Sequence, residues 1–195
     1  MPKIGAEPIR RAALVKATIE TIGEAGTLEV TVAQIARRAG MSSALAHHYF
    51  GSKEQIFLAA MRAILSQYGA EVRVALAQVA TDGPEARLRA ITIANFAPAS
   101  FKREAISAWL NFYVLAQKSA PARRLLSVYQ RRLRSNLLYE LRPLVGSRAL
   151  AVAEGLGAII DGVYIRAALT DGPADAKYAT EIVMEYLNRE LRGTA

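Results

Sequence analysis

The sequence predicts an all-α protein, because apolar residues recur at helical spacing along almost the whole chain. No run of six residues alternates between apolar and polar positions, so β-strands are not expected. Each proline after Pro2, Pro143 included, falls near an expected break and divides the chain into pieces of helical length. The first piece carries one helix face, formed by Leu14, Ala17, Thr18 and Ile22.

The helix ends are marked by capping residues. Thr31, Ser52 and Asp175 are expected N-caps, since their side chains can accept hydrogen bonds from the free N–H groups of a first helical turn. Gln34 and Gln55 stand three positions after the first two caps, which matches the capping box. The expected helices span about residues 8–25, 32–39, 43–49, 53–79, 84–95, 102–117, 121–142, 147–170 and 175–191.

Composition narrows the class of protein. The 195 residues carry a net charge of +8, and a basic excess favours an anionic partner, most often nucleic acid. The absence of cysteine excludes a disulfide framework, a cysteine-ligated zinc site and thiol catalysis. Residues 155–169 form the longest apolar stretch, which Asp161 and Arg166 interrupt and which is too short to span a bilayer. Because residues 1–5 do not lead into an apolar segment, we expect a soluble cytoplasmic protein without a membrane partner.

Residues 31–50 are the segment from which function is predicted. A short helix that Thr31 caps is followed by Gly40, which can adopt the left-handed backbone that a tight turn requires. Ser42 can cap a second short helix that begins at Ser43. Two short helices joined by a glycine-containing turn are typical of a helix-turn-helix, whose second helix enters the major groove of DNA. A plain helical hairpin with incidental polar residues is the alternative.

The polar side chains of this segment suit a DNA duplex. The second helix presents groups that can reach base edges or phosphates, and Arg10, Arg11 and Lys3 can add phosphate or minor-groove contacts. Free N–H groups at the first helix N-terminus also favour a phosphate. The expected DNA-binding residues are Thr31, Gln34, Ser42, Ser43, Ala44, His47, His48, Tyr49 and Lys53.

The same residues resemble a known family. The pattern Thr31-x-x-x-Ile35-Ala36-x-x-Ala39-Gly40-x-Ser42, followed by Tyr49-Phe50-x-x-Lys53, is similar to the signature of TetR-type repressors. The resemblance implies that the first helix of the chain braces the motif and that Lys53 contacts phosphate. The chain has Ala44 where the family usually has glycine and His47 where it often has tyrosine, and both positions lie on the recognition helix.

Further motifs resemble one subgroup of that family, the choline-responsive repressors of glycine betaine synthesis. They cover nearly the whole chain and read Met1-Pro2-Lys3-x-Gly5, Ile9-Arg10-Arg11, Asn95-Phe96, Ala108-Trp109-Leu110-x-Phe112, Arg131-Arg132-Leu133-x-Ser135-Asn136-Leu137 and Ile160-Asp161-Gly162-x-x-x-Arg166. The chain has Ala97 where the subgroup often has an acidic residue, and Tyr113 in place of a second tryptophan. The resemblance implies that choline or a related cation is the effector.

An aromatic stripe offers one candidate for effector binding. Trp109, Phe112 and Tyr113 fall at i, i+3 and i+4 and therefore share one helix face. Core packing is the plainer interpretation of such a stripe. The alternative is part of an aromatic cage for a quaternary ammonium, which Tyr164 and Tyr129 can complete.

Asp161 is the other candidate, because its neighbours Ile160 and Val163 make part of its helix face apolar. A buried carboxylate needs a partner, which is either an arginine or a helix N-terminus elsewhere in the fold, or a cationic ligand. The expected ligand-binding residues are Trp109, Phe112, Tyr113, Asp161 and Tyr164.

The C-terminal part of the chain predicts self-association. Gly155, Gly157 and Gly162 can permit close approach of a partner helix, and the segment after them is amphipathic. A single helix-turn-helix reads only a half-site, so DNA recognition also favours a homodimer. We expect the dimer to form through residues 147–170 and 175–191.

A run of bases precedes these segments. Six of them, from Lys118 to Arg134, occur without an intervening acid. A solvated face is the plainer interpretation of this run, and a second anionic site is the alternative.

Enzymatic function is not predicted. The sequence lacks Gly-x-Ser-x-Gly, His-Glu-x-x-His and P-loop motifs. His47 and His48 are the two histidines of the chain, and adjacent helical residues point about 100° apart, which is a poor arrangement for one metal ion. We therefore expect no catalytic residue, metal site or cofactor.

The sequence instead favours a ligand-responsive repressor that binds a pseudo-palindromic operator. Residues 1–52 would form its DNA-binding domain, and residues 53–195 its effector-binding and dimerisation domain. A TetR-type regulator with another ligand, or a helical adaptor that never binds DNA, is the alternative.

Overall fold

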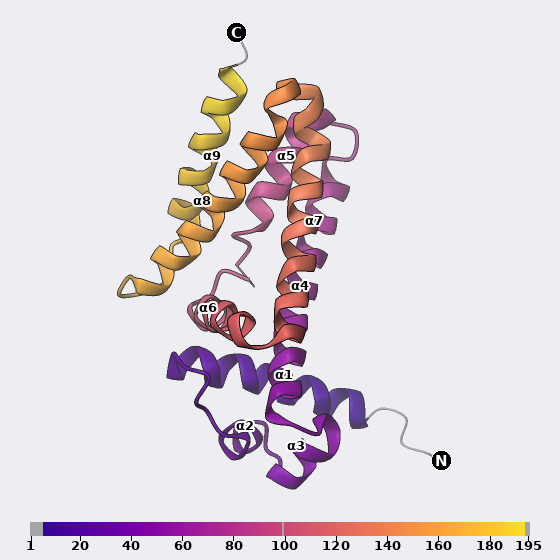
Figure 1. Ribbon diagram of the computed structural model, residues 1–195, viewed down its shortest axis with the longest axis vertical. Coiled ribbons are helices and arrows are strands. Elements are labelled where there is room, and N and C mark those ends of the chain that lie inside the picture. The colour runs from indigo at the N-terminus through magenta and orange to yellow at the C-terminus, as the bar shows by residue number, and fades with distance from the viewer. Residues whose placement is uncertain (1–5, 99, 194–195) are drawn as a thin grey trace. The chain divides into compact units, whose positions relative to one another are not determined.

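The computed structural model describes residues 6–98 and 100–193, and in this part of the chain there is no β-strand. The prediction of an all-α protein is confirmed (Figure 1). The helices are α1 (Ala6–Ala25), α2 (Val32–Arg38), α3 (Ser43–Phe50), α4 (Lys53–Gln78), α5 (Gly83–Ala94), α6 (Arg103–Lys118), α7 (Ala120–Val145), α8 (Ala149–Leu169) and α9 (Ala176–Arg192), with a 3-10 turn, η1 (Gly146–Arg148), before α8.

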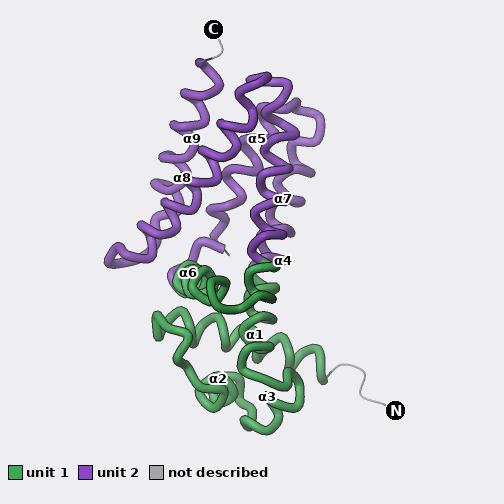
Figure 2. The backbone as a smooth tube through the Cα atoms, in the orientation of Figure 1, with its two compact units in different colours: residues 1–64, 104–125 green, residues 65–103, 126–195 purple. Residues whose placement is uncertain are grey.

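The chain folds into two compact units (Figure 2). Unit 1 comprises residues 1–64 and 104–125, and unit 2 comprises residues 65–103 and 126–195. This division by compactness differs from the functional boundary predicted at residue 52, which lies in the turn between α3 and α4. That functional boundary stays a prediction.

In unit 1, α1, α2 and α3 pack against one another. The buried residues of α1 are those of the predicted face, and Thr18 is accommodated there because its hydroxyl donates a hydrogen bond to the Leu14 carbonyl oxygen at 2.7 Å. Ile35 and Ala36 of α2 are fully buried, as is Ala46 of α3. The buried apolar side chains of these three helices therefore pack α3 against α1 and α2 and determine its position in unit 1.

The local signals of the helix-turn-helix are confirmed. Thr31 and Gln34 form the reciprocal capping box at the start of α2. Gly40 follows α2 with a φ of +68°, the left-handed backbone that the turn requires, and the N–H of Met41 returns to the Ala36 carbonyl oxygen. The Ser42 hydroxyl accepts from the N–H of Leu45 at 3.2 Å and so caps α3.

The other predicted caps also form. The Ser52 hydroxyl accepts from the N–H of Gln55 at 3.2 Å, and the Asp175 carboxylate accepts from the N–H of Tyr178 at 2.9 Å. The break expected near Pro143 lies two residues after it, because α7 continues through this proline to Val145. A proline only two residues before a helix end removes one hydrogen bond near the terminus, so the last turn tolerates it.

In unit 2, α8 packs along α9, and α9 also contacts α5. At Gly155 an added Cβ atom would lie 2.1 Å from the Tyr186 hydroxyl of α9 in the same chain, while the predicted approach of a partner helix in a dimer stays a prediction. Gly157 and Gly162 differ, since an added Cβ atom would have nothing within 4 Å. These two glycines therefore face open space among the described residues.

Residues 120–169, which form α7, η1 and α8, contain an 18-residue window that is long and apolar enough to cross a membrane by length and composition alone. One third of this window is buried in the structure. The large apolar side chains that α8 exposes are Leu150, Ile165 and Leu169.

Candidate nucleic-acid interface and effector pocket

Helix α3 presents its polar side chains outward. Ala44, His47 and His48 are exposed, Ser43 is half-buried, and the opposite face is buried through Ala46. An eight-residue helix held in this way has the dimensions to enter a major groove, with its side chains toward the base edges.

The imidazole of His47 is oriented by the backbone. Its Nδ1 atom lies 3.1 Å from the Gly51 carbonyl oxygen. Since a carbonyl oxygen can only accept, Nδ1 carries the proton and donates in this contact. In the neutral ring Nε2 is therefore an acceptor, which suits the exocyclic amino group of adenine or cytosine.

Thr31 and Gln34 largely satisfy each other. The Gln34 side-chain oxygen accepts from the Thr31 N–H at 2.6 Å and from the Thr31 hydroxyl at 3.0 Å, while that hydroxyl accepts from the Gln34 N–H. The side-chain amide N–H₂ of Gln34 is the donor that remains for a phosphate. The main role of this pair in the fold is to fix the start of α2.

The C-terminal end of α3 is anchored to α1. The Tyr49 hydroxyl accepts from Arg10 at 3.3 Å, and the Tyr49 carbonyl oxygen accepts from Arg11. The Arg11 guanidinium also lies 4.4 Å from the centre of the Phe50 ring. These contacts assign Arg11 a bracing role, in agreement with the first helix bracing the motif. Lys3 lies outside the described residues.

Lys53 occupies the first position of α4, directly after the Ser52 cap. Its ammonium lies 5.3 Å from the centre of the Phe57 ring, which holds the side chain at the helix N-terminus. A cation beside free helical N–H groups is a suitable site for a phosphate.

The two arginines of α2 have different surroundings. Arg38 donates to Glu24 at 2.7 Å and lies 3.6 Å from Glu20, both on α1. The hydrogen bond from Arg38 holds the pKa of Glu24 below its usual value. Arg37 is exposed and has no ion pair within residues 6–98 and 100–193. Sequence reasoning missed Arg37 as a phosphate-contact candidate, although no acid stands three or four positions from it.

The aromatic stripe of α6 lies in unit 1. Phe112 is fully buried, Trp109 is 6 % exposed, and Trp109 packs edge-on against Tyr113 with ring centres 5.4 Å apart. This burial is what the core-packing interpretation requires. An effector contact by these residues stays a prediction.

Tyr164 lies in unit 2 within an aromatic cluster. Its ring centre is 5.1 Å from that of Phe101 and 6.0 Å from that of Phe96. Its hydroxyl donates to the Asn95 carbonyl oxygen at 2.5 Å. Because the three rings pack on one another, Tyr164 has a structural role beside the cage role that the sequence predicts.

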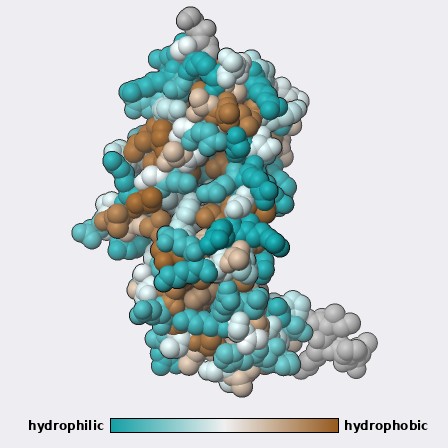
Figure 3. Space-filling model, viewed as in Figure 1, coloured by the Kyte–Doolittle hydropathy of each residue, from teal (hydrophilic) through white to brown (hydrophobic). Residues whose placement is uncertain are grey.

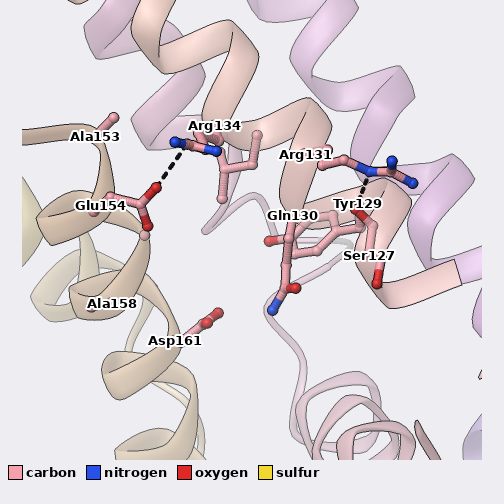
Figure 4. Close-up of a pocket in the computed structure, with 11 residues that line it drawn as sticks. Ser127, Tyr129, Gln130, Arg131, Arg134, Ala153, Glu154, Ala158 and Asp161 are labelled. Atoms are coloured by element: carbon pink, nitrogen blue, oxygen red, sulfur yellow. Dashed lines mark hydrogen bonds and ion pairs between the residues drawn. The ribbon is translucent and has the colours of Figure 1, made fainter. Parts of the chain in front are cut away.

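The structure also contains a pocket between α7 and α8 of unit 2, with a volume of about 750 Å³ (Figure 4). Asp161 projects into it from α8, as the effector hypothesis requires, and Tyr129 contributes an aromatic wall from α7. Arg134 of α7 and Glu154 of α8 form an ion pair of 2.7 Å across one end. The lining residues are Ser127, Tyr129, Gln130, Arg131, Leu133, Arg134, Ala153, Glu154, Gly157, Ala158 and Asp161.

A second tyrosine lies against the aromatic wall of the pocket. The rings of Tyr68 and Tyr129 meet edge-on with centres 5.4 Å apart. The Tyr68 hydroxyl is buried, and the Asn95 side chain lies beside it as a hydrogen-bond partner. Burial raises the pKa of Tyr68 far above its usual value, so the hydroxyl keeps its proton and remains a donor.

Sequence reasoning missed most of this pocket. It identified Tyr129 and Asp161 but assigned Arg131 and Arg134 to a solvated face. The available signal was the spacing of Glu154 and Asp161, which are seven residues apart and so share one face of α8. Arg131 and Arg134 stand three residues apart and so share one face of α7. Only the structure shows that this face of α7 meets the face of α8 that carries Glu154 and Asp161.

Comparisons with known proteins identify the family of the chain. Residues 14–60 match the model of bacterial regulatory proteins of the tetR family, and residues 84–192 match that of the BetI-type transcriptional repressor, C-terminal. The chain belongs to the BetI-type repressors of the TetR family. It therefore binds DNA through its helix-turn-helix and is a transcriptional regulator, not an enzyme.

Two BetI relatives resemble this repressor over nearly their whole length. The HTH-type transcriptional regulator BetI of Brucella abortus (strain 2308) is 50 % identical over 194 residues, which is 99 % of this chain and 97 % of the relative. BetI of Rhizobium meliloti (strain 1021) is 47 % identical over 193 residues, which is 98 % of this chain and 94 % of the relative.

Solved structures share the fold of this BetI-type repressor. A transcriptional regulator from Rhodococcus sp. Rha1 has a TM-score of 0.81 at 22 % identity, with 94 % of this chain and 96 % of that chain covered. A regulator from Saccharomonospora viridis, solved in complex with choline, has a TM-score of 0.78 at 20 % identity, with 93 % and 96 % covered.

Proposed function

We propose that this BetI-type repressor binds a pseudo-palindromic operator as a homodimer and represses genes of glycine betaine synthesis until choline binds. The observation that carries the proposal is the pocket of unit 2, in which Asp161 and the Tyr129 ring face the same space. A carboxylate and an aromatic face are the two groups that recognise a quaternary ammonium. As a transcriptional regulator, the protein would act in the cytoplasm.

Operator recognition divides between base and phosphate contacts. Ala44 and His47, which are exposed on α3, and the half-buried Ser43 would face base edges. Lys53, Gln34 and the exposed His48 would bind phosphates and so fix the orientation of α3 on the duplex. Ser42 and Thr31 would act chiefly as helix caps, because their hydroxyls already accept backbone N–H groups.

The partner for the apolar surface of α8 and α9 would be a second copy of the chain. Figure 3 shows apolar side chains on the part of the surface that these helices form. Ile165 and Leu169 of α8 and Tyr178 of α9 are large apolar residues that unit 2 leaves exposed. A dimer would cover them and would supply the second recognition helix that a two-fold operator needs.

Choline would act by linkage. If the choline-bound conformation holds the two recognition helices at a spacing that fits the operator less well, choline lowers operator affinity. A hundredfold change in affinity corresponds to about 2.7 kcal/mol of coupling. The choline complex of the Saccharomonospora viridis regulator supports choline as the ligand to test first.

The test uses DNA selected by the repressor itself. Fragments of the source genome are enriched on the purified protein, and the affinity for the enriched fragment is measured by fluorescence anisotropy with and without millimolar choline. We expect a two-fold symmetric sequence and an affinity that falls at least tenfold with choline. Unchanged affinity would exclude choline as the effector, and an asymmetric site bound by one copy would exclude the homodimer.

A further inference from the structure

Arg37 is an exposed arginine of α2 whose side chain makes no ion pair or hydrogen bond within residues 6–98 and 100–193. We propose that Arg37 is a DNA-binding residue of this repressor, with its guanidinium on the operator phosphate next to the one that Gln34 contacts. This inference rests on the operator recognition proposed above, because it takes α3 to lie in the major groove. It adds a contact from the second turn of α2 to those of Lys53, Gln34 and His48.

The first argument is that the fold uses the other lysines and arginines of this region. In the described part of residues 6–52, each of them contacts a carboxylate, a hydroxyl or a backbone carbonyl oxygen of unit 1. They are Arg10, Arg11, Lys16 and Arg38. Arg38, the neighbour of Arg37, donates to Glu24 at 2.7 Å and lies 3.6 Å from Glu20. Arg37 therefore keeps its full set of N–H donors for a partner outside the chain.

The second argument is the face of α2 on which Arg37 lies. Ile35 and Ala36 are fully buried, and they pack α2 on its neighbours. Since successive helical residues are about 100° apart, Gln34 and Arg37 both lie within about 30° of the direction opposite this buried pair. Both residues are exposed, and they are separated by about 4.5 Å along the helix axis. Their side chains therefore share one outward face of α2.

The third argument is the position of α2 in a helix-turn-helix. When the second helix lies in the major groove, the first helix crosses the sugar-phosphate backbone beside that groove. Here α2 and α3 pack on each other (Figure 1), and Gly40 and Ser42 fix the turn between them. The phosphates of one DNA strand follow one another at about 3.4 Å along the duplex axis. The spacing of Gln34 and Arg37 is thus similar to that of neighbouring phosphates.

The chemistry of the side chain suits this contact. A guanidinium is planar and always charged, and its donors can bind a phosphate at two oxygens. The residues three and four positions from Arg37 are Ala33, Gln34, Gly40 and Met41. No carboxylate at these positions weakens the positive charge. A phosphate contact fixes the orientation of the protein on the duplex and carries no base information.

The experiment measures how salt weakens operator binding, by fluorescence anisotropy on the full-length repressor and the DNA fragment that it enriches. Arg37→Gln removes the charge and keeps a polar side chain. We expect the slope of log affinity against log salt concentration to decrease by about 0.9 for each half-site bound. Near 0.1 M salt this corresponds to an affinity that is roughly tenfold lower per half-site. The loss should be similar on every operator variant, because the contact is to phosphate.

Two further variants are matched to this one. Arg37→Lys keeps the charge, so the salt slope should stay near that of the wild type, while the affinity falls less than in Arg37→Gln. Arg62 is exposed on α4 and has no ion pair within the described ranges 6–98 and 100–193. Arg62→Gln therefore makes the same change of net charge away from α2, and it should leave the slope unchanged.

Ethylated phosphates locate the contact on the DNA. Ethylation removes the charge of one phosphate at a time and inhibits binding where that phosphate is contacted. We expect one phosphate in each half-site to inhibit the wild type when ethylated and to have no effect on Arg37→Gln. This phosphate should lie next to one at which both proteins remain sensitive.

The outcomes separate this inference from the proposed operator recognition. An unchanged slope with a lower thermal unfolding midpoint for Arg37→Gln would assign Arg37 a structural role and overturn the proposal. An equal loss of slope in Arg62→Gln would overturn it too, since net charge would then be the cause. If Arg37→Gln keeps the slope while Lys53→Ala lowers it, operator recognition stands and the Arg37 contact fails. If neither lowers it, the proposed placement of the helix-turn-helix on DNA fails as well.

Discussion

The Ser119 hydroxyl donates a hydrogen bond of 2.7 Å to the Glu54 carboxylate. Ser119 is buried at the junction of α6 and α7, where its hydroxyl also accepts from the Ala122 N–H and caps α7. Glu54 follows Lys53 in the first turn of α4. Within unit 1, one hydroxyl thus connects the end of α6 to the turn that carries Lys53, the proposed phosphate contact.

Ser119→Ala should therefore weaken both stability and DNA binding. Loss of the two hydrogen bonds is expected to lower the free energy of unfolding by about 1–2 kcal/mol. Operator affinity should fall as well, because the first turn of α4 loses a constraint. Denaturant unfolding and anisotropy measure the two effects. Ser66→Ala, on the exposed side of α4, is the control and should change neither.

His47→Ala and Lys53→Ala should affect DNA binding in different ways. His47 is oriented for a base edge, so its loss should relax sequence preference at one position of each half-site. Lys53 is placed for a phosphate, so its loss should weaken all sites similarly and reduce the salt dependence by about one unit per half-site. Binding to an operator series across salt concentrations distinguishes them. A uniform loss for His47→Ala would contradict the base contact.

Gly155→Ala and Gly157→Ala form a matched pair on α8. At Gly155 the new methyl group would collide with the Tyr186 ring and hydroxyl, so we expect a loss of about 1–3 kcal/mol. At Gly157 it meets nothing, so the better helix propensity of alanine should stabilise the fold by up to about 1 kcal/mol. Thermal unfolding measures both. Tyr186→Phe should partly rescue Gly155→Ala, because it removes the nearest atom.

Ile165→Arg should convert the proposed dimer into monomers. Ile165 is 47 % exposed on α8, and a buried unpaired charge at an interface is strongly unfavourable. Ile93→Arg is the control, since Ile93 is 48 % exposed but lies on α5. Analytical ultracentrifugation should show monomers for the first variant and dimers for the second. Dimers in both cases would place the interface elsewhere.

Glu24→Gln should destabilise the protein in a pH-dependent way. The hydrogen bond from Arg38 lowers the folded-state pKa of Glu24 below its usual value of 4.5, so its stabilising contribution is present above that value. The contribution is lost as the pH falls through the folded-state pKa. The unfolding midpoints of wild type and variant should therefore differ at pH 7 and converge in acid. A difference that persists at low pH would show that the contact does not depend on the carboxylate charge.

Much of the DNA-binding region was predictable because its signals are local. The Thr31 capping box, the left-handed Gly40 and the Ser42 cap each involve residues within a few positions of one another. Helical periodicity then identified which side of α1 is buried. The expected helix end at residue 142 lies three residues before the observed end of α7 at Val145. A proline is tolerated in the last turn of a helix as well as just after it, so the sequence alone did not fix this boundary.

The candidate effector site was less predictable, because its contacts join distant residues. Tyr129 and Asp161 were recognisable by residue type, whereas the ion pair of Arg134 with Glu154 depends on how α7 meets α8. The packing of Tyr164 against Phe96 and Phe101 likewise has no signature in the spacing of these residues.

The sequence by itself determined the helices, their caps and the exposed polar face of α3, because interactions between near neighbours in the chain decide these features. Only the tertiary structure decided which polar groups are already satisfied, as in the Arg11 contact with Tyr49, and which charges surround one pocket. The physical reason is that a side chain's partner and its access to solvent depend on segments that folding brings together, and these segments are far apart in the sequence.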